Sequence, residues 1–99
     1  MNFINNSLVS IIINCHNSEK FLKETIESVI DQDFPNWEMI IWDNKSSDKT
    51  IQIAKSFKDE RIKIFQSNIF TKLGNARNLA LSKVNGEFIC FLDSDDLWM

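Results

Sequence analysis

Four short runs of strand-forming residues, separated by helix-length segments, constrain the fold of this 99-residue chain more than any other feature. The runs are LVSIIIN (8–14), EMIIWD (38–43), RIKIFQ (61–66) and EFICFL (87–92). The first two lack polar alternation, which is typical of strands that are buried on both faces of a parallel sheet. The third run alternates, so we expect a strand with one wetter face at an edge of the sheet.

The segments between these runs carry helical signals. Residues 17–18 are good N-caps, and an apolar stripe follows them over residues 21–30. Residues 46–48 (SSD) are expected to cap a second helix that runs to about residue 58. A third helix is predicted over residues 76–84 and is closed by Asn85-Gly86.

The order of these elements is β-α-β-α-β-α-β, which predicts an α/β fold with a parallel four-stranded sheet and right-handed crossovers. We expect a Rossmann-like, three-layer α/β/α domain. The pattern alone does not determine the order of the strands. Ligands of such sheets bind beyond the carboxyl ends of the strands, so the polar residues at those ends are the candidate site residues.

Composition limits the classes of protein. Apolar residues make up 43% and charged residues 25%, which are ordinary values for one globular domain. The net charge of −3, with no basic stripe, argues against a nucleic-acid partner. We see no signal peptide and no transmembrane segment, so a cytoplasmic location is expected. Cys15 and Cys90 are predicted to be buried, free thiols on neighbouring strands.

An acidic cluster, Asp93-Ser94-Asp95-Asp96, follows the last strand. Three carboxylates within four residues repel one another, although one of them could simply cap a following helix. Hard divalent cations prefer oxygen ligands, so we predict a site for Mn²⁺ or Mg²⁺ at Asp95, with Asp93 as a second ligand. Such an ion would let an acidic site bind a diphosphate and would stabilise it as a leaving group.

Polar residues near other strand and helix ends each have two interpretations. His16 is either a turn residue or a ring that stacks on a planar ligand. Asp43 either caps a turn or accepts a hydrogen bond from a nucleobase. Arg77 is either solvated or in contact with an anion near the start of the third helix. The chain has no P-loop and no dinucleotide fingerprint.

Three segments together resemble a known family: VSIIINCHNSEKFL, EMIIWDNKSSDKT and GNARNLALSKVNGEFICFLDSDD. In order and spacing they are similar to the N-terminal half of family 2 glycosyltransferases of GT-A fold, over roughly residues 8–98. The resemblance implies a strand order of 3-2-1-4 and a nucleotide-diphospho-sugar donor, usually a UDP-sugar. It also implies transfer to a sugar, lipid or protein acceptor, as in polysaccharide biosynthesis.

The same resemblance implies roles for individual residues. The loop after the first strand, with Asn14 and His16, would hold the nucleobase together with Asp43. Arg77 would lie near the nucleotide. Asp93 and Asp95 would form the D-x-D motif, in which Asp95 is the principal metal ligand and Asp93 also contacts the donor.

Two motifs depart from the family pattern. The chain has Asn14-Cys15-His16-Asn17 where Pro-x-Tyr-Asn is common, and a histidine stacks on a base less extensively than a tyrosine. It has Asp43-Asn44-Lys45-Ser46 where Asp-Asp-Gly-Ser is common. The second motif keeps the first carboxylate, loses the second, and replaces a flexible glycine by a bulky cation.

We therefore expect residues 1–99 to be a single, truncated GT-A donor-binding domain. The general base would lie beyond Met99, so transfer by this chain alone is not expected, and the full-length form could be peripheral at the inner membrane. One alternative is a non-catalytic module that binds a nucleotide-sugar or self-associates. A phosphatase of the haloacid dehalogenase type is less favoured, because its nucleophilic Asp belongs on the first strand, which ends in Asn14. Since 87–92 would lie at an open edge, a homodimer is also expected.

Overall fold

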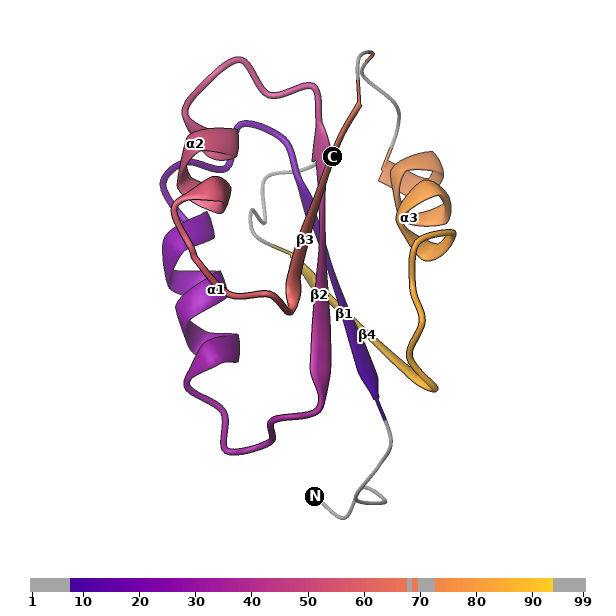
Figure 1. Ribbon diagram of the computed structural model, residues 1–99. Helices are drawn as coiled ribbons and strands as arrows, with labels where there is room; N and C mark the ends of the chain where they lie inside the picture. The colour runs from indigo at the N-terminus through magenta and orange to yellow at the C-terminus, as the bar shows by residue number, and fades with distance from the viewer. Residues whose placement is uncertain (1–7, 68, 70–72, 94–99) are drawn as a thin grey trace.

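The computed structural model describes residues 8–67, 69 and 73–93. Seven elements alternate along this part of the chain: β1 (Val9–Cys15), α1 (Leu22–Ile30), β2 (Trp37–Asn44), α2 (Thr50–Lys55), β3 (Ile62–Ser67), α3 (Leu73–Leu81) and β4 (Phe88–Asp93). The strands form one parallel sheet of order β3-β2-β1-β4 (Figure 1). The predicted fold class and strand order are confirmed.

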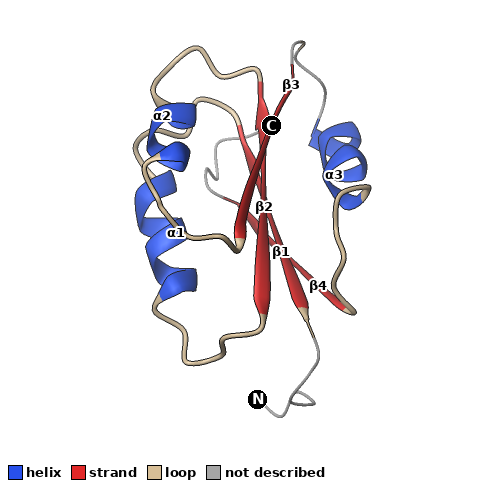
Figure 2. Ribbon diagram, in the orientation of Figure 1, coloured by secondary structure: helices blue, strands red, loops and turns tan. Residues whose placement is uncertain are grey.

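The helices lie in two layers, with α1 and α2 on one face of the sheet and α3 on the other (Figure 2). Successive residues of the central strands point to opposite faces. Ile13 therefore packs in the core beneath α1 and α2, whereas Ile12 packs beneath α3 with Ala76 and Ala80. Both faces of β1 and β2 are covered, which explains why their sequences are apolar without alternation.

Two helices are shorter than their sequences predicted. Helix α1 begins at Leu22 without a side-chain cap, because the chain first turns so that Ser18 O accepts hydrogen bonds from the amides of Phe21 (3.0 Å) and Leu22 (2.9 Å). The Ser18 hydroxyl instead accepts from the backbone N–H of His16 at 3.2 Å. Helix α2 ends at Lys55, three residues before the predicted position near residue 58.

Strand β4 lies at an edge of the sheet, next to β1, as expected. Cys15 and Cys90 are both free thiols on these neighbouring strands. Cys15 is buried, but the prediction that Cys90 is buried is wrong. Among the residues described, Cys90 lines an open apolar groove of about 580 Å³ between α1 and β4, so nothing covers it there.

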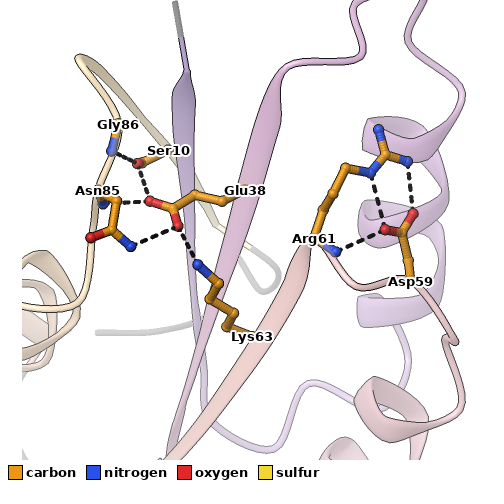
Figure 3. A network of polar contacts seen from close by, with 7 residues as sticks. All are labelled: Ser10, Glu38, Asp59, Arg61, Lys63, Asn85 and Gly86. Carbon is orange, nitrogen blue, oxygen red and sulfur yellow. Dashed lines mark hydrogen bonds and ion pairs between the residues drawn. The ribbon is translucent and has the colours of Figure 1, made fainter.

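Glu38 is a carboxylate that is only 3% exposed and lies near the amino-terminal end of β2 (Figure 3). Its Oε2 accepts hydrogen bonds from Ser10 Oγ (2.6 Å) and from the Asn85 backbone N–H (2.5 Å). Its Oε1 accepts from Lys63 Nζ (2.8 Å) and from Asn85 Nδ2 (3.3 Å). One buried charge thus joins three neighbouring strands to the turn between α3 and β4.

The Asn85-Gly86 turn brings the chain close against the start of β1. The Gly86 amide donates to Ser10 Oγ at 2.8 Å, and the Glu87 amide donates to Leu8 O at 2.9 Å. A Cβ atom on Gly86 would lie 2.7 Å from Ser10 N and 2.8 Å from Leu8 O, which are backbone atoms. Helix α3 spans Leu73–Leu81, so the prediction that Asn85-Gly86 closes it near residue 84 is wrong. The glycine is required instead for this close approach.

The start of β3 is anchored by Arg61. Its guanidinium makes two hydrogen bonds to the Asp59 carboxylate, at 2.7 and 3.0 Å (Figure 3). It also lies 3.7 Å from the centroid of the Trp37 ring. Hydrogen bonds from Arg61 lower the pKa of Asp59. The pair holds the turn before β3 against the first residue of β2.

The ionisation of Glu38 contributes to stability. Burial opposes its charge, but the hydrogen bonds from Lys63, Ser10 and Asn85 outweigh burial and lower its pKa from 4.5 to about 2. Because the pKa is lowered in the folded state, this stabilisation is present above pH 4.5 and is lost as the pH falls towards 2.

We predict that Glu38→Gln lowers the free energy of unfolding at pH 7 by about 2–3 kcal/mol, because the neutral amide leaves the ammonium and amide donors poorly satisfied. Urea unfolding at pH 7 and pH 3 measures this change, and the difference between wild type and variant should shrink at pH 3. Glu60→Gln, at an exposed position, is the matched control. Equal stability of Glu38→Gln and wild type at pH 7 would contradict the role assigned to Glu38.

Candidate functional site

The carboxyl ends of the three adjacent strands β2, β1 and β4 lie level with one another. In the sheet register, Cys15 of β1 pairs with Asp43 of β2, and Asn14 of β1 pairs with Asp93 of β4. Since successive residues of a strand alternate between faces, Asn14 lies on the α3 side and Asp43 on the α1–α2 side. Three residues predicted from sequence thus belong to one edge of the sheet.

Asp43 is fully buried at this edge. Its Oδ2 accepts a hydrogen bond from the Ser46 backbone N–H at 3.2 Å, and its Oδ1 accepts one from the Ser46 hydroxyl. The carboxylate therefore closes the turn that follows β2, and this part of its role is the capping role considered for the sequence.

His16 lies directly after β1 and is half-buried. Its Nδ1 is 2.7 Å from the backbone oxygen of Asn44. A carbonyl oxygen can only accept, so Nδ1 carries the hydrogen and donates it. The imidazole ring is thereby held against the end of β2.

The loops β1–α1 and β2–α2 are joined by a set of hydrogen bonds between residues that are about 30 positions apart. Asn17 N–H donates to Ser46 Oγ (2.8 Å), Ser47 N–H donates to Asn17 Oδ1 (2.8 Å), Ser18 N–H donates to Thr50 Oγ1 (2.8 Å), and Glu19 N–H donates to Asp48 Oδ2 (3.3 Å). Residues 46–48 were expected only to cap a helix, and their hydrogen bonds to residues 17 and 19 were not predicted. The two loops form one polar unit at the carboxyl edge.

Asp48 belongs to this unit and is ionised readily. Burial opposes its charge, but hydrogen bonds from the side chain and the amide of Thr50 and from the amide of Glu19 lower its pKa. It also supplies the amide of Thr50, the first residue of α2, with an acceptor at 2.9 Å. The N-cap position of α2 is Lys49, which makes no side-chain cap bond, so of the capping predicted for the SSD segment only this bond from the Thr50 amide to Asp48 is present among the described residues.

Two residues of the unit have left-handed backbone conformations: Asn17 with φ of 50° and Lys45 with φ of 52°. Asparagine tolerates this region because its short polar side chain bonds locally, whereas lysine does not. Lys45 occupies the position at which glycine is common in the family motif, and its backbone has the left-handed conformation that suits glycine.

The remaining predicted residues are placed less fully. Arg77 lies in α3, and Asp93 is the last residue of β4. Asp95 lies outside the described residues. Within the residues described, no group of three or more His, Cys, Asp or Glu side chains could hold a metal ion.

The fold and its polar edge define a Rossmann-like domain that presents strand ends and loops to a ligand. The model of the family described as Glycosyl transferase family 2 matches residues 10–99, and the chain belongs to this family.

Two relatives show this kinship closely. The Escherichia coli protein WfgD, a UDP-Glc:alpha-D-GlcNAc-diphosphoundecaprenol beta-1,3-glucosyltransferase, is 42% identical over 92 residues, which are 93% of this chain and 36% of WfgD. Staphylococcus aureus TarS, solved in complex with UDP-GlcNAc, is 36% identical with a TM-score of 0.85, over 89% of this chain and 26% of that one. The chain thus spans about a third of the length of its relatives.

A more distant structure shares the fold. The mannosyltransferase PcManGT from Pyrobaculum calidifontis, solved with GDP-Man and Mn²⁺, is 23% identical with a TM-score of 0.81, over 91% of this chain and 28% of that one. In the part of the chain that is described, no helix has the length and apolar character needed to cross a bilayer.

We predict that Lys45→Gly raises the free energy of unfolding by about 0.5–1 kcal/mol, because relief of the left-handed strain exceeds the entropic cost of glycine. Chemical denaturation at pH 7 measures the gain. Lys49→Gly serves as the control, since Lys49 has φ of −85° and should gain nothing from the change. A loss of stability in Lys45→Gly would show that the lysine side chain compensates for the strain.

Proposed function

We propose that this chain is the donor-binding domain of a glycosyltransferase and binds a nucleotide-diphospho-sugar, most simply a UDP-sugar. The observation that carries the proposal is the level register of β2, β1 and β4, which brings Asp43, Asn14 and Asp93 to one edge of the sheet. The relatives support the choice of nucleotide, since WfgD is named for a UDP-Glc donor and TarS was solved with UDP-GlcNAc.

In this proposal the nucleobase lies over the two joined loops. His16, held by its hydrogen bond to Asn44 O, would offer a fixed ring face, and Asn14 and Asp43 would supply polar groups from the ends of β1 and β2. Asp43 uses one lone pair of each oxygen for Ser46, so contact with a base N–H would use the remaining ones. Arg77 would contact the nucleotide from α3.

The divalent ion is proposed to lie beyond the end of β4. Asp93 ends that strand and pairs in register with Asn14 of β1, and Ser94-Asp95 follow it in the sequence, so residues with the hard oxygen ligands that such an ion prefers come directly after a strand end. Asp95, with Asp93, would hold Mn²⁺ or Mg²⁺. The bound ion would neutralise the charge that develops on the diphosphate leaving group.

The acceptor is proposed to be a sugar, a lipid or a protein. WfgD is named for a diphosphoundecaprenol-linked acceptor, which supports transfer at a membrane surface. The relatives are much longer than the segment matched here, so the general base and the acceptor site are proposed to lie outside residues 1–99.

We predict that UDP binds this chain only with Mn²⁺ or Mg²⁺ present and that Asp95→Ala weakens binding at least about tenfold, because the diphosphate then meets uncompensated carboxylates. Calorimetry with UDP, with and without metal, measures both effects. Asp33→Ala, which removes an exposed carboxylate from the loop between α1 and β2, is the control. Metal-independent binding that is equal in wild type and Asp95→Ala would refute the metal assignment.

The exposed edge of β4 supports a further proposal, that the chain forms a homodimer. Phe88, Ile89 and Phe91 are 42–45% exposed along this edge strand. Within the described residues of β4, no basic residue and no proline protects this edge strand against pairing with another strand.

We predict that light scattering gives about twice the monomer mass of 11.6 kDa at high concentration. Phe91→Lys should shift the protein towards monomer, because it adds a charge to the edge. Phe21→Lys, at a phenylalanine that directly precedes α1 and is 42% exposed, should leave the mass unchanged. A monomer at every concentration tested would exclude the dimer.

A further inference from the structure

Ser46 is a side chain at the carboxyl edge that bonds to both candidate base-binding segments. Its Oγ accepts a hydrogen bond from the Asn17 amide at 2.8 Å and donates one to Asp43 Oδ1. Its own backbone N–H donates to Asp43 Oδ2 at 3.2 Å. Because an amide can only donate and a carboxylate accepts, the two hydrogen bonds run in one direction, from the Asn17 amide through the Ser46 hydroxyl to the Asp43 carboxylate.

The Asn17 residue that donates the first of these hydrogen bonds has an unusual backbone conformation. Asn17, next to His16 in the chain, has φ of 50°, which costs energy for any residue with a side chain. It is held there by Ser46 Oγ at its amide and by the Ser47 amide at its Oδ1 (2.8 Å). Without the Ser46 hydroxyl, the Asn17 amide and Asp43 Oδ1 each lose a partner, and the link between Asn17 and the Asp43 carboxylate is lost, although other hydrogen bonds between the two loops remain.

We infer that Ser46 is a positioning residue that sets His16 relative to Asp43 for recognition of the donor's nucleobase. The inference rests on the proposed function. A role in turn formation alone would affect folding or all ligand contacts alike. Positioning of the base site would affect the nucleobase and leave the contacts of the diphosphate unchanged, since the metal is assigned to a different strand end.

The experiment compares UDP with inorganic pyrophosphate, each with Mn²⁺, by calorimetry on wild type, Ser46→Ala and Ser46→Thr. Ser46→Ala should weaken UDP binding about tenfold and leave pyrophosphate binding within about twofold. Ser46→Thr keeps the hydroxyl and should bind UDP nearly as wild type does. Ser56→Ala is the matched control, because that hydroxyl donates only to Ile53 O, at 2.6 Å, near the end of α2.

The outcomes separate this inference from the proposed function. Absence of metal-dependent UDP binding in wild type would contradict the proposed function and, with it, this role. If wild type binds UDP, unchanged UDP affinity in Ser46→Ala would overturn the positioning role alone, as would an equal loss for UDP and pyrophosphate. If thermal unfolding shows that Ser46→Ala is not folded, Ser46→Cys, with its weak thiol donor, should show the same difference between the two ligands.

Discussion

The two-sided pairing of β1 is the constraint on which the rest of the structure depends. This strand is hydrogen-bonded to β2 on one side and to β4 on the other, in registers that leave the three carboxyl ends level. Its residues Ile12 and Ile13 are fully buried on opposite faces, so a slip by one residue would exchange the two cores. The positions of Asn14, Asp43 and Asp93 along the sheet edge follow from this register.

The two ends of the sheet are stabilised by different chemistry. At the amino end, an ionised and buried Glu38 ties the return of the chain from α3 to three strands, and its lowered pKa makes that tie dependent on pH only in acid. At the carboxyl end, hydroxyl, amide and carboxylate groups of two loops satisfy one another. The buried Glu38 carboxylate and its ion pair with Lys63 therefore lie at the end of the sheet opposite the edge where a ligand would bind, and that edge is polar.

Much of the fold could be predicted from the sequence, because the apolar runs and stripes report burial, and burial decides which elements face the core. The order 3-2-1-4 required the resemblance to a family. The residue at which α1 starts could not be predicted, because it depends on a turn in which the Ser18 carbonyl oxygen accepts hydrogen bonds. The exposure of Cys90 could not be predicted either, because it depends on the open groove beside β4. The hydrogen bond between Asn17 and Ser46 could not be predicted either, because it joins residues that are 29 positions apart.

The two departures from the family pattern meet in space, which bears on how the domain would select its donor. His16, where tyrosine is common, donates from Nδ1 to the carbonyl of Asn44, where a second aspartate is common. A tyrosine ring has no ring N–H to make this bond, so the histidine gives up stacking area but gains an attachment to β2. A base site built in this way would depend on the fixed geometry of its two loops, and among the bonds that join them Ser46 alone connects Asn17 to the Asp43 carboxylate in the described part of the chain.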